Sequence, residues 1–382
     1  MFFLYIEVAK NLKDFFFYLK LYFCRKICYY MFVCEPIFLY LCNRNTPYIY
    51  YIMNDIAFYT IKGADDFCAK ICTLGAKIAE LHVPNQKGEV KDVVLGFRHA
   101  EEWSRKELYF NAICGRVANR IKNGHFILDG RTYQLPANDG ANCLHGGEKG
   151  FHAVIWEVVS HDAQSVKLHY CAKDGEEGFP GNVNMWVTYE MTQDYRLIIH
   201  YEATTDQPTI VAPTNHAYFN LAGEGSGSIR EHLLQIHADK YTPFDDTFCP
   251  TGAIQSVNGT PMDWREGMRI GDKIDDVYFA HSHGIDNNWC LCENGVPKQL
   301  RHAATLQADG RRMECWTTMP GLQVYTGNYV EQNIGKSGRM YDKQHAICLE
   351  AQYWPDSIHH PAFPSIVLRP NEKLDEVTEY RF

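Results

Sequence analysis

Short segments with apolar residues at every second position constrain the fold of this chain more than any other feature. Residues 166–170 and 183–189 follow this pattern, and 195–201 repeats it directly after Gln193-Asp194. A period of two is typical of β-strands that bury one face. Sustained helical periodicity is hard to find, so the pattern predicts an all-β fold with few short helices.

Two further segments predict β-hairpins with two-residue turns. Residues 126–135 would fold back at the Asp-Gly pair 129–130, and 303–318 at the Asp-Gly pair 309–310. Asp-Gly between alternating strands is a strong signal for a hairpin turn. Many short strands, with turn signals every ten or so residues, predict a large antiparallel β-sandwich or barrel.

The aromatic residues divide the chain into two parts. The 382 residues include 21 Phe, 24 Tyr and 7 Trp, and residues 1–52 hold 17 of these 52 aromatics while containing no glycine. Charged residues interrupt the apolar runs of this segment, so it is poorly suited to span a membrane. We expect an N-terminal extension over 1–52 that does not belong to the fold, with a gene-model artefact as the hypothesis for its origin, and one domain over 53–382. A signal or membrane anchor in 1–52 is the alternative.

Net charge and cysteine spacing limit the classes of binding partner and the cellular compartment that we expect for this protein. Lys plus Arg total 37 against 46 Asp plus Glu, a formal net charge of -9. This balance argues against binding to nucleic acid or to an anionic membrane surface. The ten cysteines of 53–382 lack disulfide-framework and zinc-ligand spacing, which predicts buried reduced thiols, a cytoplasmic location and no metal site.

Polar residues concentrate in four stretches that interrupt the strand pattern. The stretches are 115–121 with two arginines and Asn119, 142–147 with His145 before two glycines, 213–221 around His216, and 348–365 around Glu350. Glu350 stands out because it follows an apolar run that predicts a buried strand, and burial of an unpaired carboxylate is costly. Each stretch alone also fits a structural or solvent-exposed role.

Together, and in this order, the stretches resemble the signatures of the aldose 1-epimerases, also called galactose mutarotases. Segments 259–263 and 320–328 are similar to two more motifs of that family. The resemblance covers about residues 55–382. It implies a large antiparallel sandwich of the galactose mutarotase type, called a supersandwich, with an open sugar-binding cleft.

The resemblance also implies roles for seven residues. His216 corresponds to the catalytic acid of the family and Glu350 to its catalytic base. The implied sugar-binding residues are Asn119, Arg120, His145, Asp286 and Gln323. Around Asp286 the chain departs from the family pattern, since Ile285 precedes it where an aromatic is usual and Asn287 follows it where a histidine is usual.

The implied reaction interconverts the α and β anomers of hexoses such as galactose and glucose. The C1 hydroxyl loses a proton while the ring oxygen gains one, the ring opens, the C1–C2 bond rotates and the ring closes again. Two proton-handling groups suffice for this chemistry, so we expect no cofactor. In agreement, the chain lacks the glycine-rich nucleotide-binding patterns in a strand-turn-helix context. The expected partner is a small aldose, acted on by a monomer or homodimer.

Three other readings remain open on sequence alone. A hexose-6-phosphate 1-epimerase of the same fold would need a basic phosphate pocket, for which Arg116 is the candidate. A non-catalytic sugar-binding protein would not need the pair His216 and Glu350. A glycosidase would use two carboxylates, nominally Asp286 and Glu350, and would leave His216 without a role.

Overall fold

The computed structural model describes residues 56–104, 109–293, 296 and 298–382. Residues Asp55–Phe382 form one compact unit. The extension predicted over 1–52 lies outside the described residues, and its status stays a prediction. Within the described ranges, no helix combines the length and the apolar character needed to cross a membrane.

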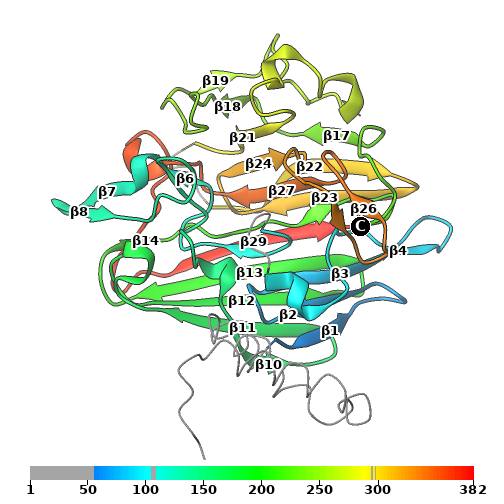
Figure 1. The fold of residues 1–382 in the computed structure, drawn as a ribbon, viewed down its shortest axis with the longest axis horizontal. Coiled ribbons are helices and arrows are strands. Elements are labelled where there is room, and N and C mark those ends of the chain that lie inside the picture. Colours follow the sequence, from blue (N-terminus) through cyan, green and yellow to red (C-terminus); the bar gives the residue numbers. More distant parts are fainter. Residues whose placement is uncertain (1–55, 105–108, 294–295, 297) are drawn as a thin grey trace, which may run out of the picture. The chain divides into compact units, whose positions relative to one another are not determined.

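The larger of the two main sheets has nine strands, and its long strands run side by side in Figure 1. Every neighbouring pair is antiparallel. In spatial order the strands are β10 (Glu157–His161), β11 (Ser165–Ala172), β12 (Val183–Met191), β13 (Arg196–Thr205), β29 (Leu374–Arg381), β23 (Arg311–Thr317), β22 (Arg301–Ala308), β17 (Leu233–Ile236) and β20 (Met268–Arg269).

The second main sheet has six antiparallel strands and carries much of the candidate site. In spatial order they are β16 (Tyr218–Phe219), β27 (Ile347–Gln352), β24 (Gly321–Tyr325), β21 (Asp286–Cys290), β18 (Lys240–Thr242) and β19 (Gln255–Ser256). One continuous hydrophobic core contains residues from both main sheets, which makes the fold a β-sandwich.

Smaller antiparallel elements complete the fold. A four-stranded sheet consists of β1 (Phe58–Lys62), β2 (Cys68–Cys72), β3 (Lys77–Pro84) and β4 (Val90–Asp92). Five two-stranded pairs are β5 (Ile113–Cys114) with β15 (Thr214–Asn215), β6 (Arg120–Ile121) with β9 (Cys143–Leu144), β7 (His125–Leu128) with β8 (Arg131–Gln134), β14 (Thr209–Ile210) with β28 (Val367–Leu368), and β25 (Asn333–Ile334) with β26 (Met340–Tyr341).

Helix is confined to short 3₁₀ turns in the described part of the chain, as the sequence predicts. These are η2 (Ala100–Ser104), η3 (Lys122–Gly124), η4 (Phe151–Ala153), η5 (Glu176–Gly178), η6 (Ile270–Asp272), η7 (Val277–Phe279) and η8 (Ser357–His359). The predicted all-β class and antiparallel sandwich are therefore confirmed.

Both predicted hairpins are confirmed with their turn residues. Strands β7 and β8 pair around Asp129 and Gly130, and β22 and β23 pair around Asp309 and Gly310. All four turn residues have positive φ, from 49° to 77°. Two successive positive φ values define the type I′ turn, whose twist matches that of the flanking strands.

The predicted buried thiols are found at seven of the ten described cysteines. Cys68, Cys171 and Cys292 are half-buried, and the others are buried. All ten are free cysteines.

Candidate active site

Alternation in two neighbouring strands explains how polar residues come to lie inside apolar runs. In β27, Leu349 and Ala351 enter the common core, while Glu350 projects from the opposite face of the sheet. In β24, Leu322 and Val324 enter the core on either side of Gln323. These two strands therefore bury apolar residues in the sandwich and place Glu350 and Gln323 on the other face of the sheet.

Strand register brings these polar residues next to one another. Gln323 lies directly opposite Glu350, and Asp286 is in the next strand along. The Gln323 amide Nε2 donates to Asp286 Oδ1 at 2.7 Å. Asn288 lies directly opposite Gln323 in β21, and Asp286 is two residues from it on the same face, so Glu350, Gln323 and Asp286 form one polar cluster across three strands.

His216 reaches the same place from the end of β15. Its main chain is held on both sides, since His216 N–H donates to Ala112 O and Asn111 N–H donates to His216 O. The Asn111 side-chain oxygen also accepts the N–H of Tyr218. The backbone that carries the imidazole is therefore fixed independently of the ring.

His145 follows β9 and has a left-handed backbone with φ of 51°. Asn119 also has positive φ, 59°, and the His145 N–H donates to Asn119 O. Positive φ is uncommon for residues with side chains and often marks functional sites. The pairing of β6 with β9 thus places His145 beside Asn119.

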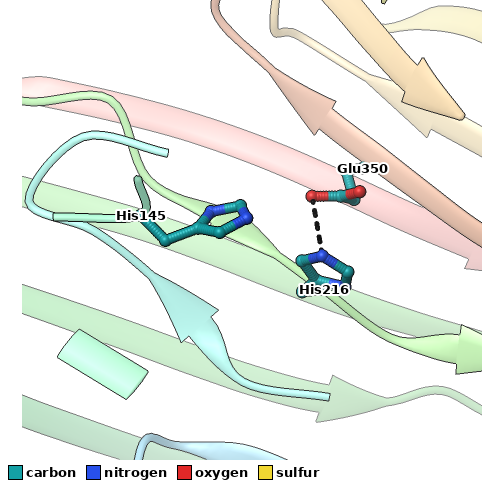
Figure 2. Close-up of side chains that lie close together, drawn as sticks. All are labelled: His145, His216 and Glu350. Atoms are coloured by element: carbon teal, nitrogen blue, oxygen red, sulfur yellow. Dashed lines mark ion pairs between the residues drawn. The ribbon is translucent and has the colours of Figure 1, made fainter. Parts of the chain in front are cut away.

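His145, His216 and Glu350 converge from three different chain segments, as Figure 2 shows. One potential ligand atom of each lies within 4.8 Å of those of the other two. His216 Nε2 is 3.6 Å from Glu350 Oε2, and both side chains are almost fully buried. This distance is longer than a hydrogen bond, so both atoms can still bond to oxygens of a bound molecule.

Burial lowers the pKa of His216 to about 4. Aromatic rings crowd the imidazole: Tyr218 stacks on it at 5.0 Å, Tyr325 meets it edge-on at 6.0 Å, and His145 lies at 5.2 Å. Desolvation disfavours the charged imidazolium in this surrounding. At neutral pH the His216 ring is therefore uncharged in the empty site.

The pKa values of the two carboxyl groups, Glu350 and Asp286, shift in the opposite direction to that of His216. Desolvation by burial raises the pKa of Glu350 well above its usual range; the charge of Asp286 adds to this, and Arg120 opposes it. Burial also raises the pKa of Asp286, again opposed by Arg120. Burial thus favours the neutral form of both groups, the protonated carboxyl of Glu350 and the unprotonated ring of His216.

The proton of His145 can be located from its hydrogen bonds. Asn119 N–H donates to His145 Nδ1 at 3.2 Å, so that nitrogen is an acceptor. Burial, with neighbouring His216, His152 and Arg120, lowers the pKa of His145 well below its usual value, so the ring is neutral. A neutral ring with an accepting Nδ1 carries its proton on Nε2. His145 can therefore donate a hydrogen bond to a ligand oxygen.

Arg120, Asn119, Asp286 and Gln323 line one cleft. Arg120 Nε donates to Asp139 Oδ2 at 2.7 Å, and its guanidinium lies over the ring of Phe248 at 5.0 Å. Arg120 also acts electrostatically on both Asp286 and Glu350. The structure thus brings together all seven residues predicted from the sequence.

Three residues of this region were not anticipated. Phe244 and Phe248 line the cleft, and Asp139 pairs with Arg120. Phe248 has φ of 61°, unusual for an aromatic residue. Their neighbours in sequence form no motif, and only the aromatic side chains themselves signal a surface suited to a sugar ring.

Two groups in the described residues have the donor types of a metal site. In the site, the accepting Nδ1 of His145 leaves a protonated Nε2, which cannot ligate a metal. The second group is Glu80, His82 and Asp92, whose carboxylates pair with Lys70 and Lys336. The His145 proton in the first group and the paired lysines in the second disfavour a metal ion.

The chain is similar to known proteins over most of its length. The family model described as aldose 1-epimerase matches residues 57–381. Galactose mutarotase from Mus musculus is 43% identical over 325 residues, covering 84% of this chain and 92% of the relative. Aldose 1-epimerase from Escherichia coli K12 is 35% identical over 311 residues, covering 81% of this chain and 90% of the relative.

A solved structure has the same fold. The crystal structure of an aldose epimerase homologue from C. elegans is 32% identical and superposes with a TM-score of 0.78. It covers 85% of this chain and 98% of the other. The similarity therefore extends across the sandwich and is not confined to the site motifs.

Proposed function

The chain belongs to the aldose 1-epimerase family and is an isomerase of aldoses, and from this premise we propose how its residues divide the reaction. Glu350 is the general base that takes the C1 hydroxyl proton, and His216 is the general acid that protonates the ring oxygen. The observation that carries this assignment is the buried pair, 3.6 Å apart, whose pKa values shift in opposite directions. Such a divergence is typical of acid–base partners.

One proton shared by the pair is enough for the complete reaction. A sugar hydroxyl bonded to Glu350 favours its ionised form, and Arg120 acts in the same direction. The proton then resides on His216, ready for the ring oxygen. In ring opening His216 gives this proton to the ring oxygen while Glu350 takes the C1 hydroxyl proton, so the pair again holds one proton, now on Glu350. After rotation about C1–C2, the same two transfers run backwards and close the ring on the other carbonyl face.

The remaining site residues bind and orient the sugar. Asp286, Gln323 and Asn119 supply donors and acceptors that match hydroxyl groups. His145 Nε2–H and Arg120 stabilise negative charge that develops on the ring oxygen as the ring opens. Phe244 and Phe248 supply the apolar wall of the cleft.

The shared proton predicts the pH dependence of kcat/KM. Since the pKa of His216 is lowered to about 4, a second proton binds only below about pH 4, and activity falls there because no base remains. On the alkaline side, activity falls where Glu350 loses its proton, far above the usual glutamate range. Polarimetric rates between about pH 4 and about pH 9, corrected for spontaneous mutarotation, test this. An acid limb near pH 6.5, the ordinary value for histidine, contradicts it.

Arg120→Ala is expected to lower kcat/KM about 10- to 100-fold, mainly through KM, because a charge-assisted hydrogen bond is worth about 1.5–3 kcal/mol. The fold should persist, since Asp139 retains partial exposure to water. Arg369→Ala, which removes an exposed arginine paired with Asp129, is the matched control and should leave kcat/KM unchanged. Wild-type kcat/KM in Arg120→Ala rejects the assignment.

The alternative function as a hexose-6-phosphate 1-epimerase needs a basic phosphate pocket, and Arg116 cannot supply it. Arg116 is buried, and its guanidinium donates to the carbonyls of Pro180, Gly181 and Lys173. An arginine committed to main-chain oxygens is not available for a phosphate. The non-catalytic alternative is disfavoured because the acid–base pair is present and buried together.

Several further properties belong to the same proposal. We expect galactose as a substrate, by similarity to relatives named galactose mutarotase, and glucose as another, from the resemblance of the sequence motifs. The catalytic domain is residues 53–382, supported by a family match that begins at residue 57. We expect it to work in the cytoplasm, as a monomer or homodimer, without a cofactor, nucleic acid or membrane partner.

A further inference from the structure

Asp356 is a buried carboxylate to which the proposed chemistry gives no role. It lies in the loop after β27, the strand of Glu350, and directly precedes η8. Its side chain is 0% exposed, and its backbone is left-handed with φ of 55°. A fully buried charge on a strained backbone persists only where surrounding contacts require it.

Those contacts attach Asp356 to the strand that carries Arg120. The Asp356 N–H donates to Arg120 O at 3.1 Å, and Asp356 Oδ1 accepts the Lys122 N–H at 3.0 Å. The two bonds hold β6 on both sides of Ile121. One residue thus makes, with its main chain and its side chain, the pair of bonds that an adjacent strand would make.

Two histidines that follow in the chain hold the Asp356 carboxylate. His359 Nδ1 lies 2.6 Å from Oδ1, and His360 Nε2 lies 3.5 Å from Oδ2. The His359 contact therefore shares Oδ1 with the Lys122 N–H, and His360 lies at ion-pair distance from Oδ2. Both bonds to β6 also need the left-handed backbone of Asp356, because this conformation directs its N–H and its side chain toward the same strand.

The guanidinium of Arg120 is held separately, by Asp139 and by the ring of Phe248. Its main chain is held by the pairing of β6 with β9 and, in addition, by Asp356. The loop that contains Asp356 continues from the strand of Glu350, so the bonds to β6 connect the base to the residue proposed to bind the sugar.

We propose that Asp356 is a positioning residue for Arg120, fixing the main chain of β6 so that the guanidinium faces the sugar and Glu350. This inference rests on the sugar-binding role proposed for Arg120. Asp356 touches no reacting atom and acts only through the strand that it holds.

Asp356→Gly tests the proposal with little other disturbance. Glycine adopts the left-handed conformation freely and keeps the N–H bond to Arg120 O, so only the carboxylate is lost. We expect kcat/KM to fall about 10- to 100-fold, mainly through KM, because small displacements of binding groups have effects of this size. Asp356→Asn keeps the acceptor for Lys122 N–H and tolerates positive φ, so its kcat/KM should stay within about threefold of wild type.

Asn371→Gly is the matched control. Asn371 also has positive φ, 71°, but is exposed and lies in the turn before β29. This variant should retain wild-type kcat and KM. If Asp356→Gly does not fold, Asp356→Ser, whose hydroxyl is shorter than the carboxylate, takes its place.

A double-mutant cycle separates positioning from general stabilisation. If Asp356 acts through Arg120, Asp356→Gly in the Arg120→Ala background should change kcat/KM by less than about threefold. The same loss in both backgrounds, or an Asp356→Asn variant as impaired as Asp356→Gly, overturns the inference while leaving the role of Arg120 intact. Wild-type kcat/KM in Arg120→Ala alone overturns both.

Discussion

Glu350→Gln is expected to lower kcat for mutarotation by about 10²- to 10⁴-fold, the usual contribution of one general acid–base group. Glutamine has the shape of the protonated carboxyl but can neither accept nor release the proton. Sugar binding should change little, since the amide still offers an oxygen and an N–H. Polarimetry of a freshly dissolved α-aldose measures the rate.

The same substitution should not weaken the fold. Because the pKa of Glu350 is raised in the folded state, wild-type stability falls as pH rises above the unfolded glutamate value of about 4.3. Glutamine does not titrate, so the Tm of Glu350→Gln at pH 7 should equal or exceed that of wild type. Glu379→Gln, which alters a mostly buried glutamate of β29, is the control and should keep full activity. Near-wild-type kcat in Glu350→Gln means that Glu350 is not the base.

His216→Asn is expected to have a similarly large effect on kcat, about 10²- to 10⁴-fold, because the variant lacks the group that protonates the ring oxygen. The main chain of His216 is anchored by Ala112 and Asn111, so the site should keep its shape. Asparagine fills less of the space between the aromatic rings that pack around His216, so we expect a moderately lower Tm.

The control for this variant is His302→Asn. His302 is a partly buried histidine stacked on Trp316 in the nine-stranded sheet, and burial lowers its pKa as well. It should lose some stability but no activity. If His216→Asn and His302→Asn retain equal rates, the acid is another group, and His145 is the next to test.

Local features of the fold were readable from the sequence because they depend on neighbouring residues. The Asp-Gly turns at 129–130 and 309–310 require positive φ, and alternation over 183–189 assigns each side chain of β12 to one face. The order in which strands pair was not readable in this way. The neighbours β13 and β29 are separated by more than 160 residues, and only packing of the complete core selects that pairing.

The site residues also divide into those that local sequence reveals and those that only long-range contacts reveal. Glu350 was noticeable because a carboxylate follows an apolar run, and β27 shows the reason: its two faces meet different surroundings, the core and the cleft. Phe248 and Asp139 escaped notice because their importance lies in contact with Arg120 across long sequence separations. Asp356 was part of a recognised motif, but its two bonds to β6 are visible only in three dimensions.

The most direct test is the optical rotation of freshly dissolved α-galactose, followed with wild-type protein and with the double variant Glu350→Gln/His216→Asn. Wild-type protein should speed the approach to the equilibrium rotation in proportion to its concentration. The double variant should leave the spontaneous rate unchanged, although it folds. Equal acceleration by both proteins would contradict the assignment of the acid–base pair, and no acceleration by wild type would contradict galactose as a substrate.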